Sequence, residues 1–204
     1  MDGIVLKENE DKSELLLGVE IQSNLKWSKQ IVRVVKKLKC RIAGLNKLKY
    51  LVPYHTRNTI VTGIFNSVLI YCLPLYGGCS KGQVRELLQN RAGQIVSHKP
   101  PFTNRNNLFD QLRWMTVYQL IVYHIVLTVK KSREPEYLAR FLNSEGRNGR
   151  IPRTKLSLAK NSFCYRGSEN WNCLPETLRR CDKIGAFKVG LRNWVCQNVP
   201  RFPE

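Results

Sequence analysis

Acidic side chains, the usual ligands of catalytic metal ions, are few and scattered along this sequence. Only four of the 204 residues are aspartates, Asp2, Asp11, Asp110 and Asp182, and no two of them are adjacent. A two-metal polymerase or nuclease centre needs carboxylates that converge on ions lying close together. The chain offers no such set, so we expect neither metal-dependent polymerase or nuclease chemistry nor a resident cofactor.

Other catalytic and metal-binding patterns are missing as well. The sequence contains no GxSxG and no recognisable Ser–His–Asp motif. The run 77–82, GGCSKG, lacks the GxxxxGK[ST] order that points backbone amides and a lysine at one phosphate, and a helix end followed by a helix cap explains it. Seven cysteines without a CxxC pair, beside three isolated histidines, favour reduced thiols over zinc ligands. The isolated chain is therefore predicted not to be an enzyme.

Cationic side chains are the groups that this sequence supplies in quantity. The chain has 34 Lys and Arg against 15 Asp and Glu, a formal net charge of +19. From residue 21 to residue 85 there is no acidic residue at all. Cations without internal counter-ions point to a polyanionic partner, either nucleic acid or an acidic membrane.

The basic residues concentrate in one amphipathic stretch, residues 25–51. Its apolar side chains recur every three or four residues, which places them on one face of an α-helix. These apolar residues are Ile31, Val35, Leu38, Ile42, Leu45 and Leu48. The ordinary interpretation is a basic face that is merely solvated. We predict instead that the face lies along a phosphate backbone. The predicted contact residues are Lys26, Lys29, Arg33, Lys36, Lys37, Arg41 and Lys47.

Around this helix the sequence predicts a mainly α-helical protein with a short N-terminal β-hairpin. Two apolar runs, 4–7 and 15–21, flank a polar turn and predict the two strands, with a bulge or a close backbone approach at Gly18. Asn24 or Ser28 is placed to cap the basic helix. Further helices are predicted over residues 53–71, 80–96, 108–112, 116–131, 136–142 and 186–197, with another opening near residue 175.

The composition changes between residues 143 and 161, which are polar, glycine-containing and basic. No acidic residue lies between Glu145 and Glu169. This composition predicts an exposed linker or arm. Arg147, Arg150 and Arg153 are its candidates for phosphate contact.

Neither a membrane span nor a secretion signal is predicted. The longest apolar run, 60–75, is interrupted by polar residues and by Pro74. The first fourteen residues lack the basic and apolar regions of a signal peptide. We expect an intracellular protein of the nucleus or cytoplasm, not secreted, with nucleic acid as its partner and no membrane or small-molecule substrate.

Four blocks carry a family resemblance. The first is LLLGVEIQSNLKWSKQI (15–31), continued by VVKKLKCRIAGLNKLKYLVP (34–53). The others are NSVLIYCLPLYGGCS (66–80), LLQNRAGQIV (87–96) and SFCYRGSENWNCLPETLR (162–179). In this order they resemble the region that follows the catalytic palm of non-LTR (LINE-type, jockey-like) retrotransposon reverse transcriptases. The resemblance covers nearly the whole chain, and the four blocks together are far more specific than any one alone.

The resemblance implies a domain organisation. Residues 1–23 would be the remnant of a hairpin at the end of the palm, and residues 24–142 a helical thumb-like domain. Residues 143–161 would be a basic linker, and residues 162–204 a C-terminal segment of aromatic residues and helices.

The resemblance also implies roles and an absence. The hairpin residues Leu17, Gly18 and Val19 would lie near the primer end, while the basic helix holds the template–primer duplex. The family's palm, whose YxDD aspartates bind Mg²⁺, would precede Met1. The family's RNA-directed DNA polymerase activity is therefore not expected of this chain by itself.

Two functions follow from the sequence. In the first, the chain is the thumb and C-terminal region of a reverse transcriptase, and it binds RNA–DNA duplex without sequence preference and without catalysis. In the second, it is a stand-alone, non-specific nucleic-acid-binding protein. A helical protein-interaction or membrane-surface module ranks lowest, because no predicted helix has a wide aromatic–aliphatic face with a basic rim.

Overall fold

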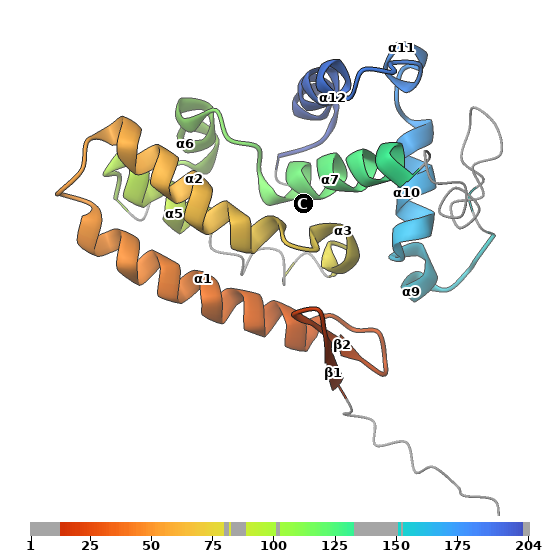
Figure 1. Ribbon diagram of the computed structural model, residues 1–204, viewed down its shortest axis with the longest axis horizontal. Helices are drawn as coiled ribbons and strands as arrows, with labels where there is room; N and C mark the ends of the chain where they lie inside the picture. Colours follow the sequence, from red (N-terminus) through yellow and green to blue (C-terminus); the bar gives the residue numbers. More distant parts are fainter. Residues whose placement is uncertain are drawn as a thin grey trace, which may run out of the picture.

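The computed structural model describes residues 13–79, 82, 89–100, 103–132, 151 and 153–201. Within these residues the protein is mainly α-helical, with a two-stranded antiparallel hairpin on its N-terminal side, which confirms the predicted fold class. Figure 1 shows two long helices, α1 and α2, running in opposite directions, with α7 at the centre of the molecule beyond the C-terminal end of α2.

The hairpin is formed by β1 (Ser13–Leu16) and β2 (Val19–Gln22). Its turn residues, Leu17 and Gly18, both have positive φ, 48° and 80°, as a two-residue type I′ turn requires. The predicted strand over 15–21 is therefore wrong, because this turn divides it into two paired strands, and Gly18 occupies the turn rather than a bulge. The other predicted strand, 4–7, lies outside the described residues.

Helix α1 (Ser28–Leu48) forms where the basic amphipathic stretch predicted it. It packs against α2 (Tyr54–Ile70) and α5 (Gln89–Ser97). Its buried apolar residues are Ile31, Val34, Leu38, Ile42 and Leu45. The stripe therefore passes through Val34 rather than Val35, and Leu48, at the end of the helix, is exposed.

A side chain from the hairpin caps α1. The Gln22 Oε1 atom accepts hydrogen bonds from the Lys29 N–H and the Ser28 hydroxyl, both at 3.0 Å. In return, the Gln30 Oε1 atom accepts from the Glu20 N–H at 2.9 Å. The prediction that Asn24 or Ser28 caps the helix is wrong, because the buried Gln22 supplies the acceptor at the start of α1. Together with Gln30 it fixes the hairpin to α1.

The remaining described helices include three that the sequence did not predict, over residues 73–76, 157–160 and 163–172. The second of these lies within the predicted linker 143–161. The remaining described helices are α3 (Leu73–Tyr76), α6 (Arg105–Leu112), α7 (Val117–Ser132), α9 (Ser157–Lys160), α10 (Phe163–Asn172), α11 (Glu176–Arg179) and α12 (Ile184–Asn198). The predicted helix 108–112 begins three residues earlier, where the Asn104 side chain caps it. Of the predicted helix 80–96, the structure describes residue 82 and residues 89–96, and the latter belong to α5. The predicted helix 136–142 lies outside the described residues.

Two hydrophobic cores meet at α7. The first lies between α1, α2, α3, α5, α6 and the first half of α7. In the second, Val126 and Val129 from the other half of α7 pack with Trp171, Phe187 and Leu191 of α10 and α12. The C-terminal segment is thus joined to the N-terminal helices by one shared helix.

Candidate nucleic-acid interface

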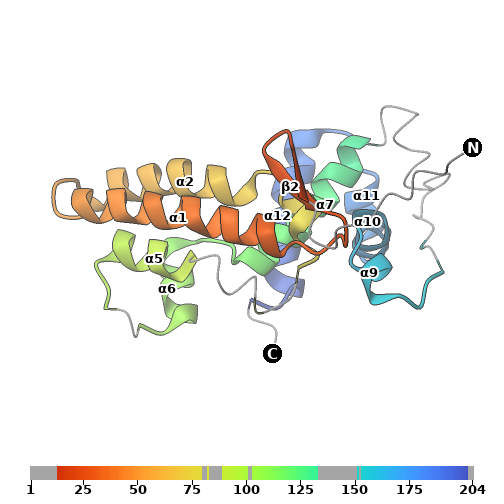
Figure 2. The same cartoon turned by 90° about the horizontal axis from the view of Figure 1, so that it is seen from below.

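The exposed side of α1 carries four of the predicted contact residues. Lys36, Lys37, Arg41 and Lys47 are all exposed, as is Lys39 between them. Lys36 and Lys47 are eleven residues apart, about three helical turns, so they lie on one line along the helix. Figure 2 shows α1 uncovered in that view, with α2 beside it and α5 against its other flank. Because the opposite face of α1 is packed, the helix presents these cations to solvent in a fixed arrangement.

No acidic residue on α1 or α2 compensates these charges. Glu20, at the hairpin, is half-buried and accepts a hydrogen bond from the Ser13 hydroxyl at 3.1 Å. The Lys29 ammonium donates to the same hydroxyl at 3.3 Å, so Lys29 is engaged with β1. The exposed face of α1 therefore has a positive potential that would attract a polyanion over about 10 Å at ordinary salt.

A cavity of about 340 Å³ opens beneath the hairpin turn. The turn residues Leu17 and Gly18 line it together with Arg33 and Lys37 of α1. The Tyr71 hydroxyl, from the end of α2, donates to the Leu17 carbonyl at 2.6 Å and holds the turn in place. Two residues of the predicted primer-end hairpin thus lie beside two predicted phosphate contacts.

Arg33, which lines this cavity, has a side-chain N–H group without an acceptor among the described residues. Its Nε atom is buried, and within the described part of the chain no acceptor pairs with it. Buried donors in proteins are nearly always satisfied, so an unsatisfied one needs an explanation.

Other predicted site residues lie elsewhere. Val19 is only 3% exposed and packs inward. Lys26 precedes α1 and lines a different cavity. Arg153 is exposed on the segment before α9, not on α1. Arg147 and Arg150 lie outside the described residues.

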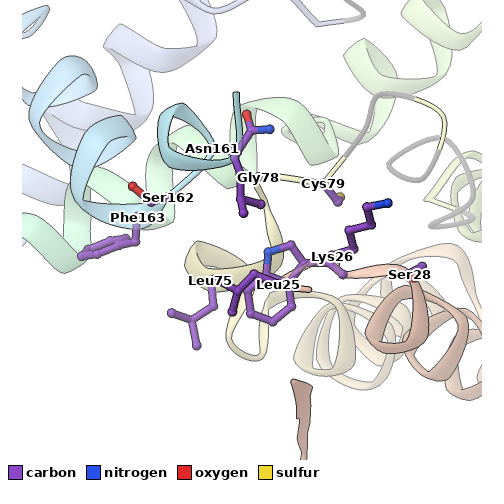
Figure 3. A pocket seen from close by; sticks show the side chains of 11 residues that line it. Leu25, Lys26, Ser28, Leu75, Gly78, Cys79, Asn161, Ser162 and Phe163 are labelled. Atoms are coloured by element: carbon purple, nitrogen blue, oxygen red, sulfur yellow. The ribbon is translucent and has the colours of Figure 1, made fainter. Parts of the chain in front are cut away.

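The second cavity, of about 430 Å³, lies where three segments meet. Figure 3 shows its labelled side chains arriving from the start of α1, from the end of α3 and from the α9–α10 connection. Its wall is largely apolar, with Leu25, Trp27, Leu75 and Phe163 among the lining residues. Burial raises the pKa of the Cys79 thiol in this wall to about 11, although the nearby Arg166 charge opposes the rise. The thiol is thus neutral at pH 7 and not an activated nucleophile.

Sequence reasoning missed one buried cation, Arg57 of α2. Its Nε–H donates to the Val96 carbonyl at 2.8 Å, and Nη1 donates to the carbonyls of Lys49 at 2.5 Å and Val52 at 3.3 Å. The available signal was a lone arginine within the otherwise uncharged run 53–71. Gln22, Gln30 and Tyr71 gave no such signal, because their partners are distant in the sequence or belong to the backbone.

Metal-binding and membrane-spanning features were sought across the described residues. Among these residues, no group of three or more His, Cys, Asp or Glu side chains could hold a metal ion. Taken singly, the described helices are all too short or too polar to cross a membrane. The pair α6 and α7 has the required length and composition only when combined across a 49° bend.

Comparisons of the chain with protein-family models, with curated proteins and with solved structures returned no match.

Proposed function

We propose that this protein binds the sugar–phosphate backbone of a nucleic-acid duplex, an RNA–DNA hybrid in particular, through the exposed face of α1. It reads no sequence and catalyses no polymerisation as an isolated chain. The observation that carries the proposal is a packed helix whose exposed side is cationic and free of acidic residues. The cations concerned are Lys36, Lys37, Lys39, Arg41 and Lys47.

The dimensions of α1 suit this role. A helix of 21 residues is about 31 Å long, and double-stranded DNA rises about 3.4 Å per base pair, so α1 is about as long as nine base pairs of DNA duplex. Lysine and arginine side chains that neutralise phosphates release condensed counter-ions, which provides sequence-independent affinity. Contacts to phosphates orient a protein on the duplex but carry no base information.

The resemblance to non-LTR reverse transcriptases supports a more specific form of the proposal. In it, α1 and the helices around it are the thumb that holds the template–primer duplex, and the hairpin turn lies near the primer end. Leu15, Leu16 and Leu17 are all exposed on the hairpin, which suits a surface that a catalytic palm covers. The cavity beside Arg33 and Lys37 is then a second contact with the backbone.

A pair of substitutions on α1 tests the proposal. Lys36→Gln combined with Lys47→Gln removes two outward charges without changing the packed face. Fluorescence anisotropy with a labelled, blunt RNA–DNA duplex measures the affinity at several salt concentrations. We expect the slope of log K against log salt to become shallower by about 1.8, and the affinity at about 100 mM salt to fall roughly tenfold or more.

The matched control is Lys183→Gln combined with Lys188→Gln, which removes the same charge from exposed positions at and near α12. We expect this pair to bind almost as the unmodified protein does. Equal losses in both pairs would mean that net charge, rather than α1, governs binding. A salt-independent affinity would contradict backbone contact, and nucleotide incorporation by the purified chain would contradict the non-catalytic part.

A preference for anionic vesicles over duplex would instead favour the membrane-surface alternative. Vesicles rich in phosphatidylserine, titrated under the same conditions as the duplex, provide that comparison.

A further inference from the structure

The turn between α1 and α2 forms one end of the molecule, far from the hairpin (Figures 1 and 2). It exposes side chains that are normally buried: Tyr50 is 80% exposed, Leu51 is 76% exposed and Tyr54 is 44% exposed. His98, which follows α5, lies against this turn. We call Lys49, Tyr50, Tyr54 and His98 the aromatic tip. An exposed cluster of this kind is typical of a binding surface.

Neighbouring side chains orient the Tyr50 ring. The ring centroids of Tyr50 and His98 are 5.3 Å apart, with an interplanar angle of 65°, an edge-to-face arrangement. The Lys49 ammonium lies 5.2 Å from the Tyr50 centroid, within the range of a cation–π interaction. The ring is thus held by its neighbours while most of its surface stays open to solvent.

The backbone beneath the tip is also fixed. Arg57, only 6% exposed, binds the carbonyls of Lys49 and Val52 in the turn and that of Val96 in α5. His98 has a positive φ of 52°, which residues other than glycine seldom adopt. A bond from the Lys99 N–H to the Gln94 carbonyl, 3.1 Å long, closes the end of α5 around it. Two α-helix ends therefore present the tip as a preformed surface.

The charge around the tip has one sign. Lys47 and Lys99, which are close in sequence to Lys49 and His98, are exposed. Acidic residues are absent from α1, α2 and the described residues 89–100. The cost of desolvating His98, together with the charges of Arg57 and Lys49, lowers the pKa of its imidazole. The ring is therefore mainly neutral at pH 7 and suited to stacking.

We infer that the aromatic tip binds an unpaired nucleotide, whose base stacks on Tyr50 and whose phosphates face Lys47, Lys49 and Lys99. Every nucleobase has a π-face, so a single stranded ligand is held without sequence preference. An apolar protein partner would instead have to desolvate these cations without neutralising them. The inference rests on the proposed function in one respect: a duplex bound along α1 would bring its unpaired strand to the C-terminal end of that helix, where the aromatic tip lies.

The test combines a change in the protein with a change in the ligand. The probe is an RNA–DNA duplex with a short single-stranded overhang, which carries either normal bases or abasic sites. Tyr50→Leu keeps an apolar side chain at the tip but removes the aromatic ring, and Tyr50→Phe keeps the ring. We expect normal overhang bases to tighten binding about fivefold or more over abasic ones in the unmodified protein and in Tyr50→Phe, but not in Tyr50→Leu.

Leu51→Ala is the matched control, since it removes a neighbouring exposed side chain that has no ring. We expect the effect of the overhang bases to persist in it. Persistence of that effect in Tyr50→Leu, or its absence in the unmodified protein, would overturn the inference. Overhangs of RNA and of DNA, at the 5′ and the 3′ end, are measured separately, and binding to any of them through Tyr50 supports it.

Blunt duplex separates this inference from the proposed function. If blunt duplex binds well but the overhang adds nothing, the inference fails and the proposed function stands. If the overhang binds through Tyr50 while blunt duplex does not bind, the inference stands and the proposed function fails.

Discussion

Arg57 is a buried guanidinium that binds carbonyl oxygens rather than a carboxylate. Two of its acceptors lie where helices end: Lys49 is the C-terminal cap residue of α1, and Val96 is in the last turn of α5. Carbonyls at helix ends lack partners within their own helix, and the helix dipole there favours a cation. One side chain therefore stabilises both helix ends and the turn that carries Tyr50.

Arg57→Ala is expected to lower the free energy of unfolding by about 3 kcal/mol, because buried carbonyls would lose their donor. Arg57→Lys would recover only part of this loss, since an ammonium lacks the fork that reaches carbonyls from three segments. Urea denaturation followed by circular dichroism measures both effects. Arg91→Ala, at an exposed site on α5, is the control and should change the stability by less than about 0.5 kcal/mol. A loss of similar size in this control would contradict the special role of Arg57.

At the scale of elements, the contact between the segment that follows α3 and the segment that follows α9 depends on one glycine. A Cβ atom at Gly78 would lie 2.2 Å from the carbonyl oxygen of Asn161, closer than nonbonded atoms approach. Backbone would have to move to relieve that contact, because the clashing atom is not part of a flexible side chain. Gly78 therefore sets how closely the α9–α10 connection approaches the end of α3, where the larger cavity lies.

Gly78→Ala is expected to destabilise the protein by about 1–3 kcal/mol, the usual cost of overpacking. Gly44→Ala makes the opposite change, since a Cβ on that α1 residue meets no atom within 4 Å. It should stabilise the protein by up to about 1 kcal/mol through helix propensity. Thermal unfolding of the two variants in parallel tests this, and an equal effect of both would contradict the packing argument.

Elements whose apolar residues follow a simple period were predictable from the sequence. Helices α1, α2, α7 and α12 fall within about three residues of their predicted bounds. Helix α10 was missed because two of its buried residues, Gly167 and Ser168, are small and give no apolar stripe. The hairpin turn was missed because a leucine adopts the positive φ that is typical of Asn or Gly.

The candidate site also has parts that the sequence predicts and parts that it does not. The basic face of α1 is a property of one helix, and its spacing is visible in the sequence. The cavity between Gly18, Arg33 and Tyr71 depends on how the hairpin folds over α1 and α2, which local patterns do not encode. The contacts made by Arg57 and His98 were likewise beyond prediction, because their partners are up to 48 residues away.

At the scale of the whole molecule, α7 is the element that the two hydrophobic cores share. Loosening α7 would expose both cores, so we expect the described helices to unfold together. His124 is half-buried on this helix, and its ring packs edge-to-face against Tyr123 at 5.3 Å between centroids. Burial, helped by the charge of Lys131, lowers the pKa of His124.

This shift predicts that acid weakens the fold. In the unfolded chain His124 takes up a proton near pH 6.5, whereas in the folded protein it does so only at lower pH. The free energy of unfolding should therefore be highest above pH 6.5 and should fall as the pH drops towards 5. The lowered pKa of His98 acts in the same direction.

Comparison with His124→Gln isolates the contribution of this residue. The variant should lose stability less steeply between pH 7 and pH 5 than the unmodified protein does, as measured by urea denaturation at each pH. Asp110, whose pKa the hydrogen bond from Arg201 lowers, titrates below this window and does not interfere. Parallel pH profiles for the two proteins would show that His124 contributes nothing.

Helix α1 is attached at both ends, so its length sets the distance between the hairpin and the turn that carries Tyr50. Gln22 and Gln30 fasten the hairpin to its first turn, while Arg57 fastens the turn that follows its last residue. Together they set the distance and the angle between the hairpin and the aromatic tip. Each residue added within α1 would lengthen the separation by about 1.5 Å and rotate one end by about 100° relative to the other. The number of residues in α1 therefore determines both the distance and the angle between the hairpin and the aromatic tip.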